Sequence, residues 1–210
     1  MRALRAALLG LALGACHAQK PPISLAPPLG DAPYEEVLDA WTREDRVYDR
    51  LESRIFATAT FHSPSFRRAF LMRREDFSGP GSEEARRLSL TDSSAEEGFE
   101  FFLSVSTPTT DWNDLDEPDS IWRVSLVTED GRTSKAKITR VKPNANVRAI
   151  YTYITDYAFT YSVRFPLTDD TGAPIIGSAT RQIRLELASS VGKASLVWDL
   201  VPLVHAGGSD

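Results

Sequence analysis

The stretch that decides the fold is Phe99-Glu100-Phe101-Phe102-Leu103-Ser104-Val105-Ser106, in which apolar residues hold every odd-numbered position. Side chains of an extended chain point alternately to the two faces of a sheet, so these odd positions share one face. This period of two predicts a strand with one buried face. The same alternation recurs in later segments of the chain.

Four further runs repeat the alternation, at 122–126, 159–165, 183–187 and 196–200. Turn residues separate them: Glu129-Asp130-Gly131, Asp169-Asp170-Thr171-Gly172, and a short link over 189–193 that predicts a hairpin. Several short strands with regular turns favour an antiparallel β-sandwich of Ig-like general shape over 99–204. No cysteine pair accompanies the tryptophans, so antibody-type homology is not implied.

Residues 31–98 predict a helical N-terminal portion with one strand, which makes the fold class α+β and mainly β. A helix is expected from Ala32 to Arg54, capped by Asp31, because apolar residues recur there at three- and four-residue spacings. This helix would pack on its own sheet or, as the alternative, bind a partner.

After that helix, residues 54–62 alternate and predict a strand. Ser63-Pro64 then supplies a cap and a first position for a second helix, which Gly79-Pro80-Gly81 ends. A short helical piece is expected over 82–90.

Leu13-Gly14-Ala15-Cys16 ends a short apolar run led by Arg2 and Arg5, and Cys16 is the only cysteine. The run is far shorter than the roughly 20 residues that cross a bilayer. These residues resemble the lipobox of bacterial lipoproteins. The resemblance implies a signal peptide over 1–15 and a diacylated Cys16 whose new amine is also acylated. The alternatives are an ordinary signal peptide and an N-terminal helix with an unmodified thiol.

Residues 16–30 hold two Pro-Pro pairs and few groups that could build a core, which predicts a tether with a reach on the order of 40 Å. A Pro-rich ligand for an aromatic groove is the alternative. His17 follows the cysteine where enterobacterial lipoproteins retained in the inner membrane carry aspartate, so the resemblance favours the outer membrane. Residues 205–210 are expected to be frayed.

Composition and net charge limit the classes of function that are expected. At 42% apolar and 25% charged residues the chain is typical of a globular protein. Removal of 1–15 takes away Arg2 and Arg5 and changes the formal net charge from −5 to −7. A nucleic-acid-binding surface is expected to be basic, so no nucleic-acid partner is expected.

Motifs for common chemistries are absent from the sequence. It contains no G-x-S-x-G, C-x-x-C, H-E-x-x-H, P-loop or G-x-G-x-x-G, so no catalytic residue and no cofactor is assigned. Of the three histidines only His62 lies in a predicted element, and an ordinary surface or strand-end histidine is favoured over a catalytic one. A carboxylate-dependent hydrolase stays open, because paired acids leave no fixed spacing.

Five carboxylates fall between 111 and 119, in a loop that separates two predicted strands. Calcium takes six to eight oxygen ligands, so this loop could bind it, but Leu115 breaks the EF-hand spacing and the required glycine is missing. A solvated loop whose side chains satisfy their own turns is the favoured interpretation. The candidate metal ligands are Asp111, Asp114, Asp116 and Asp119.

Three arginine pairs, Arg67-Arg68, Arg73-Arg74 and Arg86-Arg87, lie in or beside the second helix. They could contact anionic headgroups or an acidic partner, and the candidates for partner binding are Arg67, Arg68, Arg73 and Arg74. Nearby glutamates and aspartates favour solvated faces with local ion pairs instead.

The strand-rich half also resembles uncharacterised bacterial envelope lipoproteins. The resemblance is carried by Trp112-Asn113-Asp114-Leu115, Ile121-Trp122-Arg123-Val124 and the ending Gly192-Lys193-Ala194-Ser195-Leu196-Val197-Trp198. It implies no activity. The expected function is a non-enzymatic, lipid-anchored envelope module with a binding or structural role, and an envelope protein is the candidate partner. The alternatives are a carboxylate-dependent envelope hydrolase and a calcium-stabilised adhesion or interaction module.

Overall fold

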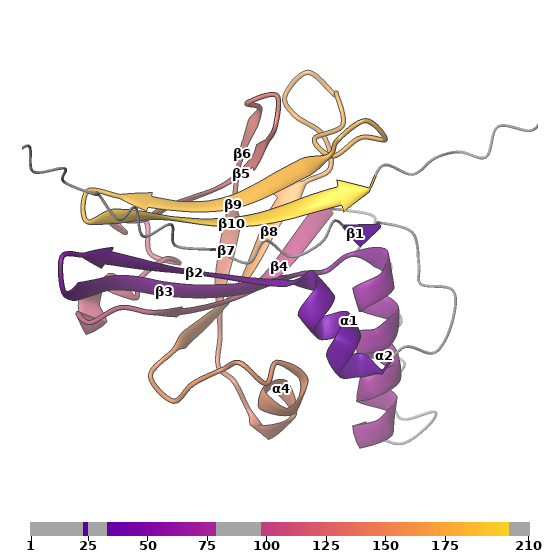
Figure 1. Ribbon diagram of the computed structural model, residues 1–210, viewed down its shortest axis with the longest axis horizontal. Helices are drawn as coiled ribbons and strands as arrows, with labels where there is room; N and C mark the ends of the chain where they lie inside the picture. Colours follow the sequence, from indigo (N-terminus) through magenta and orange to yellow (C-terminus); the bar gives the residue numbers. More distant parts are fainter. Residues whose placement is uncertain (1–22, 25–32, 79–97, 202–210) are drawn as a thin grey trace, which may run out of the picture.

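The computed structural model describes residues 23–24, 33–78 and 98–201, and these residues build two packed β-sheets with helices on one side (Figure 1). The first sheet has the order β1-β10-β9-β5-β6. Its strands are β1 (Ile23–Ser24), β10 (Gly192–Val201), β9 (Gln182–Ser189), β5 (Arg123–Thr128) and β6 (Thr133–Lys135).

The second sheet has the order β2-β3-β4-β8-β7, and all its neighbours are antiparallel. Its strands are β2 (Thr42–Asp49), β3 (Glu52–Phe61), β4 (Gly98–Ser106), β8 (Phe159–Pro166) and β7 (Lys137–Val141). The predicted α+β, mainly antiparallel sandwich is therefore confirmed.

The core lies between the sheets and is built by the period-two pattern. On β4, Phe101, Leu103 and Val105 are fully buried, and Leu185 on β9 is fully buried in the facing sheet. Burying one such side chain contributes about 1.5–3 kcal/mol. Trp198 of β10 is also fully buried, and its indole N–H donates to the Trp41 carbonyl at 2.9 Å.

The two sides of the sandwich are closed differently. On one side only Ala136 separates β6 from β7, so a single bent segment passes from the first sheet to the second. On the other side the sheets are joined by side chains of β2, which contact the backbone of β10.

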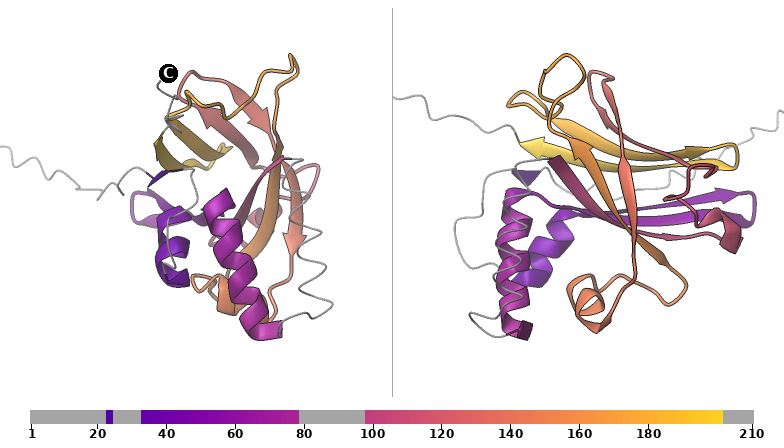
Figure 2. Two further views of the ribbon diagram at one scale, coloured as in Figure 1. Left: turned by 90° about the vertical axis from the view of Figure 1, so that its right-hand side faces the viewer. Right: turned by 180° about the vertical axis from the view of Figure 1, so that it is seen from behind.

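Helices cover the outer face of the second sheet, and the last residue of the first helix reaches β10 (Figures 1 and 2). They are α1 (Tyr34–Trp41), α2 (Pro64–Ser78) and α4 (Ala145–Ile150), and a short 3-10 helix, η2 (Thr110–Trp112), precedes β5. The Ser63 hydroxyl accepts from the Phe66 N–H at 3.1 Å, so the predicted cap of α2 is confirmed. The Tyr34 hydroxyl donates to the Ile150 carbonyl at 3.0 Å and ties α1 to α4.

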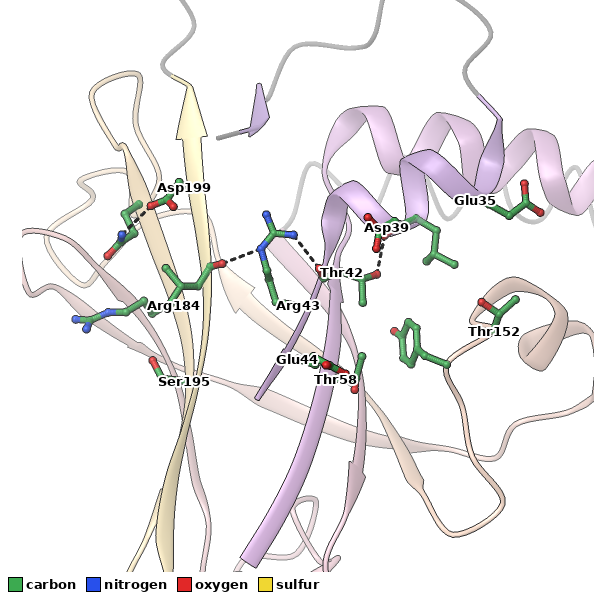
Figure 3. A pocket seen from close by; sticks show the side chains of 14 residues that line it. Glu35, Asp39, Thr42, Arg43, Glu44, Thr58, Thr152, Arg184, Ser195 and Asp199 are labelled. Atoms are coloured by element: carbon green, nitrogen blue, oxygen red, sulfur yellow. Dashed lines mark hydrogen bonds between the residues drawn. The ribbon is translucent and has the colours of Figure 1, made fainter. Parts of the chain in front are cut away.

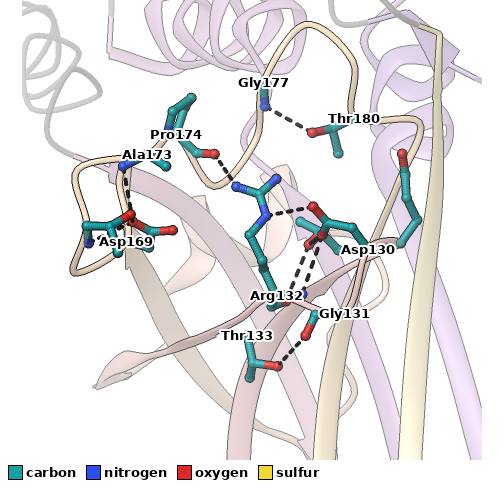
Figure 4. A network of polar contacts seen from close by, with 12 residues as sticks. Asp130, Gly131, Arg132, Thr133, Asp169, Ala173, Pro174, Gly177 and Thr180 are labelled. Carbon is teal, nitrogen blue, oxygen red and sulfur yellow. Dashed lines mark hydrogen bonds and ion pairs between the residues drawn. The ribbon is translucent and has the colours of Figure 1, made fainter.

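The predicted turns are confirmed at the end of the sandwich shown in Figure 4. Gly131 and Gly172 both adopt φ of 84°, a backbone conformation that favours glycine. The Arg132 guanidinium joins the two loops, donating to Asp130 at 2.8 Å and to the Pro174 carbonyl at 2.7 Å.

The predicted helix from Ala32 to Arg54 is wrong beyond Trp41. Residues 42–49 form β2 and pair with β3, so the N-terminal portion contributes two strands rather than one. Side chains over 42–49 alternate between the two faces of β2: Arg43 and Asp45 face the other sheet, and Glu44 is exposed. The helical spacing of the apolar residues obscured this alternation in the sequence. Because β3 pairs with β4, the two portions divided at residue 98 share one sheet.

The predicted tether over 16–30 also needs correction. Ile23 and Ser24 pair in parallel with Leu200 and Val201 of β10, so the chain already joins the fold at Ile23. The remainder of 16–30 lies outside the described residues. From Cys16 to Ile23 an extended chain reaches about 20 Å, half the expected distance.

A candidate binding groove across the seam of the sheets

Two charged side chains of β2 form a seam between the sheets. The Arg43 guanidinium donates from Nε to the Val197 carbonyl at 2.9 Å, and the Asp45 carboxylate accepts from the Ser195 N–H at 2.7 Å. Both bonds satisfy backbone groups along the side of β10 that faces β2. Charged side chains that point inward from an edge strand also protect that strand against pairing with other chains.

A groove of about 870 Å³ crosses this seam, with Arg43 at its middle (Figure 3). This volume lies within the range of about 300–1,000 Å³ that is typical of ligand sites. Its walls come from α1, both sheets and the segment after α4. They are lined by Glu35, Leu38, Asp39, Thr42, Arg43, Glu44, Thr58, Thr152, Tyr153, Gln182, Arg184, Ser195, Val197 and Asp199.

A chain of hydroxyl groups holds one wall of the groove in place. The Thr60 hydroxyl is 2.7 Å from that of Thr42 and 2.8 Å from that of Tyr153. The Thr42 hydroxyl donates to the Leu38 carbonyl, so the Thr60 hydroxyl donates to Thr42 and accepts from Tyr153. This wall is therefore preorganised by bonds that link α1, β2 and β3 to the segment after α4.

The groove is acidic. Four carboxylates and two guanidinium groups line it, which gives a formal charge of −2. Burial lowers the pKa of Arg43, while the carboxylates of Asp39 and Asp199 act in the opposite direction. Arg184 lies 3.9 Å from Glu186, which is not a lining residue, and its buried Nε has no hydrogen-bond partner among the described residues.

A partly buried polar chain joins Glu100, His62 and Tyr151. The Tyr151 hydroxyl is 2.8 Å from His62 Nε2, and His62 Nδ1 is 3.6 Å from the Glu100 carboxylate. When the His62 proton is on Nδ1, Nε2 accepts from Tyr151. Ser162 donates to the same carboxylate at 2.7 Å, and Arg164 pairs with it at 3.4 Å.

Electrostatics keep Glu100 ionised. Burial raises the pKa of this carboxyl, but the contacts with His62, Ser162 and Arg164 outweigh burial and lower it to about 2. Burial also raises the pKa of Tyr151 well above its usual value. Tyr151 is only 3% exposed and stacks on Phe102 with ring centroids 3.7 Å apart, so the chain ends in the core rather than in the groove.

The acidic loop does not contribute to the groove, and its carboxylates diverge. Asp116 pairs with Arg140 at 3.0 Å, and Asp114 accepts from Ser120 at 2.8 Å. Asp111 and Asp119 are exposed. Among the residues that the structure describes, no group of three or more acidic, histidine or cysteine side chains is placed to hold a metal ion, so these four candidates are not brought together.

The candidate arginines of α2 have different surroundings. Arg73 lies 3.5 Å from Glu35, with its guanidinium carbon 5.6 Å from the centre of the Tyr34 ring, and therefore helps to join α2 to α1. Arg74 lies over Phe70 at 5.6 Å, and Arg67 points to the Gly98 carbonyl at 3.5 Å. Arg68 is exposed, so the four do not form one binding surface.

Some predicted residues lie outside the described part of the chain: Cys16, Arg86, Arg87, the helical piece over 82–90 and the tail over 205–210. Within the described ranges, none of the helices has the length and apolar character needed to cross a membrane. No family model, curated protein or solved structure matches this chain.

Sequence reasoning missed the residues that build the groove. Arg43 fell inside a predicted helix, and Tyr153 lies between recognised strands. The one available signal was the alternation of inward and exposed residues over 42–49. The partner positions on β10 are about 150 residues away and leave no local signal.

Proposed function

We propose that this protein is a lipid-anchored module of the bacterial cell envelope that binds a ligand in the groove across the seam of its sheets. The groove carries the proposal, because it is large enough for a ligand, polar, and held by hydrogen bonds between segments far apart in the sequence. The lipobox-like residues at 13–16 support the anchor. They favour an outer-membrane location, with an envelope component as partner.

Binding rather than catalysis fits the side chains. The buried relay of Glu100, His62 and Tyr151 resembles a proton-transfer chain, but its last hydroxyl faces the aromatic core. A general base must reach its substrate within hydrogen-bond distance. The groove itself holds carboxylates and hydroxyls without any histidine or cysteine.

Site-specific photo-crosslinking in living bacteria tests this function. A benzophenone amino acid replaces Thr58, which lines the groove, or Thr139, an exposed residue of β7 that does not. We expect a light-dependent adduct of one defined mass in the membrane fraction for Thr58 and none for Thr139. The same adduct at both positions, or none at either, contradicts a binding role for the groove.

A further inference from the structure

The first sheet has an outer face, pointing away from the second sheet, that none of the described helices covers (Figures 1 and 2). On β9 and β10, Leu185 and Trp198 point inward and are fully buried, so the residues between the inward positions point outward. The register extends this outward set to β5 and β6, because Ser125 lies opposite Glu186 on one side and Lys135 on the other. These four strands therefore present one continuous outer face.

This outer face carries more cations than carboxylates, with one cation from each of the four strands. Its charged residues are Arg123 of β5, Lys135 of β6, Arg184 and Glu186 of β9, and Lys193 and Asp199 of β10. Four cations and two carboxylates give the face a formal charge of +2, whereas the whole chain has −5. The face is therefore opposite in sign to the protein that carries it.

Both carboxylates of the outer face are engaged within it. Glu186 is shared by Lys193 at 2.9 Å and Arg184 at 3.9 Å, and its side chain is only 13% exposed. Asp199 accepts from the Gln182 side chain at 2.8 Å. Lys193 is 56% exposed, so this cation reaches solvent more readily than the carboxylate with which it pairs.

The other two cations are not neutralised. Arg123 and Lys135 are both exposed, and neither lies within ion-pair distance of a carboxylate among the residues that the structure describes. On the adjoining seam, the charges of Arg43 and Asp45 cancel each other. The excess positive charge of the outer face is thus available to an anionic partner.

The expected lipid anchor joins this same sheet. Ile23 of β1 pairs with Leu200, so the chain enters the fold at the edge of the first sheet. Cys16 precedes Ile23 by seven positions, which an extended chain spans in about 20 Å. An acylated Cys16 therefore holds the first sheet near the bilayer.

We propose that the outer face of the first sheet rests on the anionic headgroups of the bilayer that holds the anchor. Basic side chains near an anionic membrane are attracted to it over about one Debye length, roughly 10 Å at 0.1 M salt. Their aliphatic stems let the charged ends reach the phosphates while the sheet stays outside the bilayer. This inference rests on the proposed function for the anchor, and it directs α1, α2 and α4 away from the membrane.

Vesicle flotation tests the proposal on the mature chain with Cys16→Ser, which is free of lipid. The probes are vesicles of phosphatidylcholine with phosphatidylglycerol, vesicles of phosphatidylcholine alone, and polyglutamate. We expect the chain to float with the anionic vesicles at low ionic strength, to be released by added salt, and not to float with the neutral vesicles. Equal flotation with both vesicles, or with neither, overturns the proposal. Binding to polyglutamate without flotation also overturns it and assigns the face to an acidic protein.

A matched pair of double variants separates the outer face from net charge. Arg123→Gln with Lys135→Gln removes two cations from the face, and Arg68→Gln with Lys142→Gln removes two exposed cations outside it. We expect the face variant to bind anionic vesicles at least about tenfold more weakly and the control to change less than about twofold. Equal weakening in both variants overturns the proposal, because attraction would then follow net charge alone. Melting temperatures of both variants report that the fold is retained.

A dye reports which face touches the vesicle. The Cys16→Ser chain has no cysteine, so Thr133→Cys on the outer face or Thr139→Cys on β7 of the second sheet gives one labelling position. Both threonines are exposed. We expect the emission of an environment-sensitive dye to shift to the blue on anionic vesicles at position 133 and to stay unchanged at position 139. A shift at 139, or at neither position, overturns the proposed orientation.

These experiments keep the outer face and the anchor separate, because vesicle binding is measured without acyl groups. An acylated Cys16 in the natural protein together with no vesicle binding refutes the membrane-facing sheet and leaves the anchor in place. Vesicle binding together with an unmodified Cys16 supports the charge of the face and refutes the proposed function.

Discussion

The carboxylate of Asp45 accepts a 2.7 Å hydrogen bond from the backbone N–H of Ser195, which lies 150 positions later in the chain. This bond and the neighbouring one from Arg43 to Val197 connect two sheets that share no ladder along this side. Removing a partner from a partly buried bond costs about 1–3 kcal/mol. Asp45→Ala should therefore lower the free energy of unfolding by this amount in urea titrations.

Two variants sharpen the test of the seam. Asp45→Asn keeps an acceptor oxygen and should lose less stability than Asp45→Ala. Asp170→Ala removes an exposed carboxylate and should change stability by less than about 0.5 kcal/mol. Equal stability of Asp45→Ala and Asp170→Ala would show that the seam does not hold the sheets together.

Acid should weaken the fold through Glu100. The folded pKa of this carboxyl is about 2 and its usual value is 4.5, so the unfolded chain binds the proton first as pH falls. The stabilisation is complete above pH 4.5 and is lost between there and pH 2, with a limit of about 3 kcal/mol. Urea titrations over this range should show a steep decline that Glu100→Gln flattens. Glu117→Gln should keep the full decline, and an unchanged slope in Glu100→Gln would refute the assignment.

Tyr151→Phe should destabilise the protein by about 1–3 kcal/mol, because it leaves the partly buried His62 Nε2 without its partner. The ring and its stack on Phe102 are preserved, so the loss reports the hydroxyl alone. Tyr157→Phe provides the matched control, since Tyr157 is 84% exposed. Thermal unfolding of the two variants at one pH gives the comparison, and equal melting temperatures would argue against the buried chain.

Calcium should leave the melting temperature unchanged. Asp116 is paired with Arg140, and Asp114 with Ser120, so the acidic loop offers no converging set of oxygens. Thermal melts with calcium chloride and with a chelator should coincide. A melt that rises with calcium and falls with the chelator would restore the hypothesis of a calcium-stabilised module, because a ligand that binds the folded state raises its stability.

Much of the sandwich was readable from the sequence, because alternation over 99–106 and 159–165 reports burial on one face directly. The turns at Gly131 and Gly172 were also predictable, because both residues adopt a positive φ, which favours glycine locally. The strand formed by residues 42–49 could not be predicted from the sequence. These residues pair with β3 and contact β10, and apolar side chains at helical spacing suggested a longer helix.

The candidate groove was predicted less well than the fold. The acidic loop and the arginine pairs were conspicuous in sequence, yet in the described part of the chain Asp116 pairs with Arg140 and Arg73 with Glu35, and neither set converges on one site. The groove joins residues from α1, β2, β9 and β10, and no spacing rule connects positions so far apart. Its carboxylates are individually ordinary surface residues, and only the fold gathers them along one surface.

The lipid anchor at Cys16 is tested most directly by intact-mass spectrometry of the protein purified from bacterial membranes. We predict a chain that begins at Cys16, lacks residues 1–15 and carries the added mass of its acyl groups. The same protein with Cys16→Ser should carry no acyl mass. An unmodified thiol at Cys16, or a full-length chain in the cytosol, would contradict the central claim.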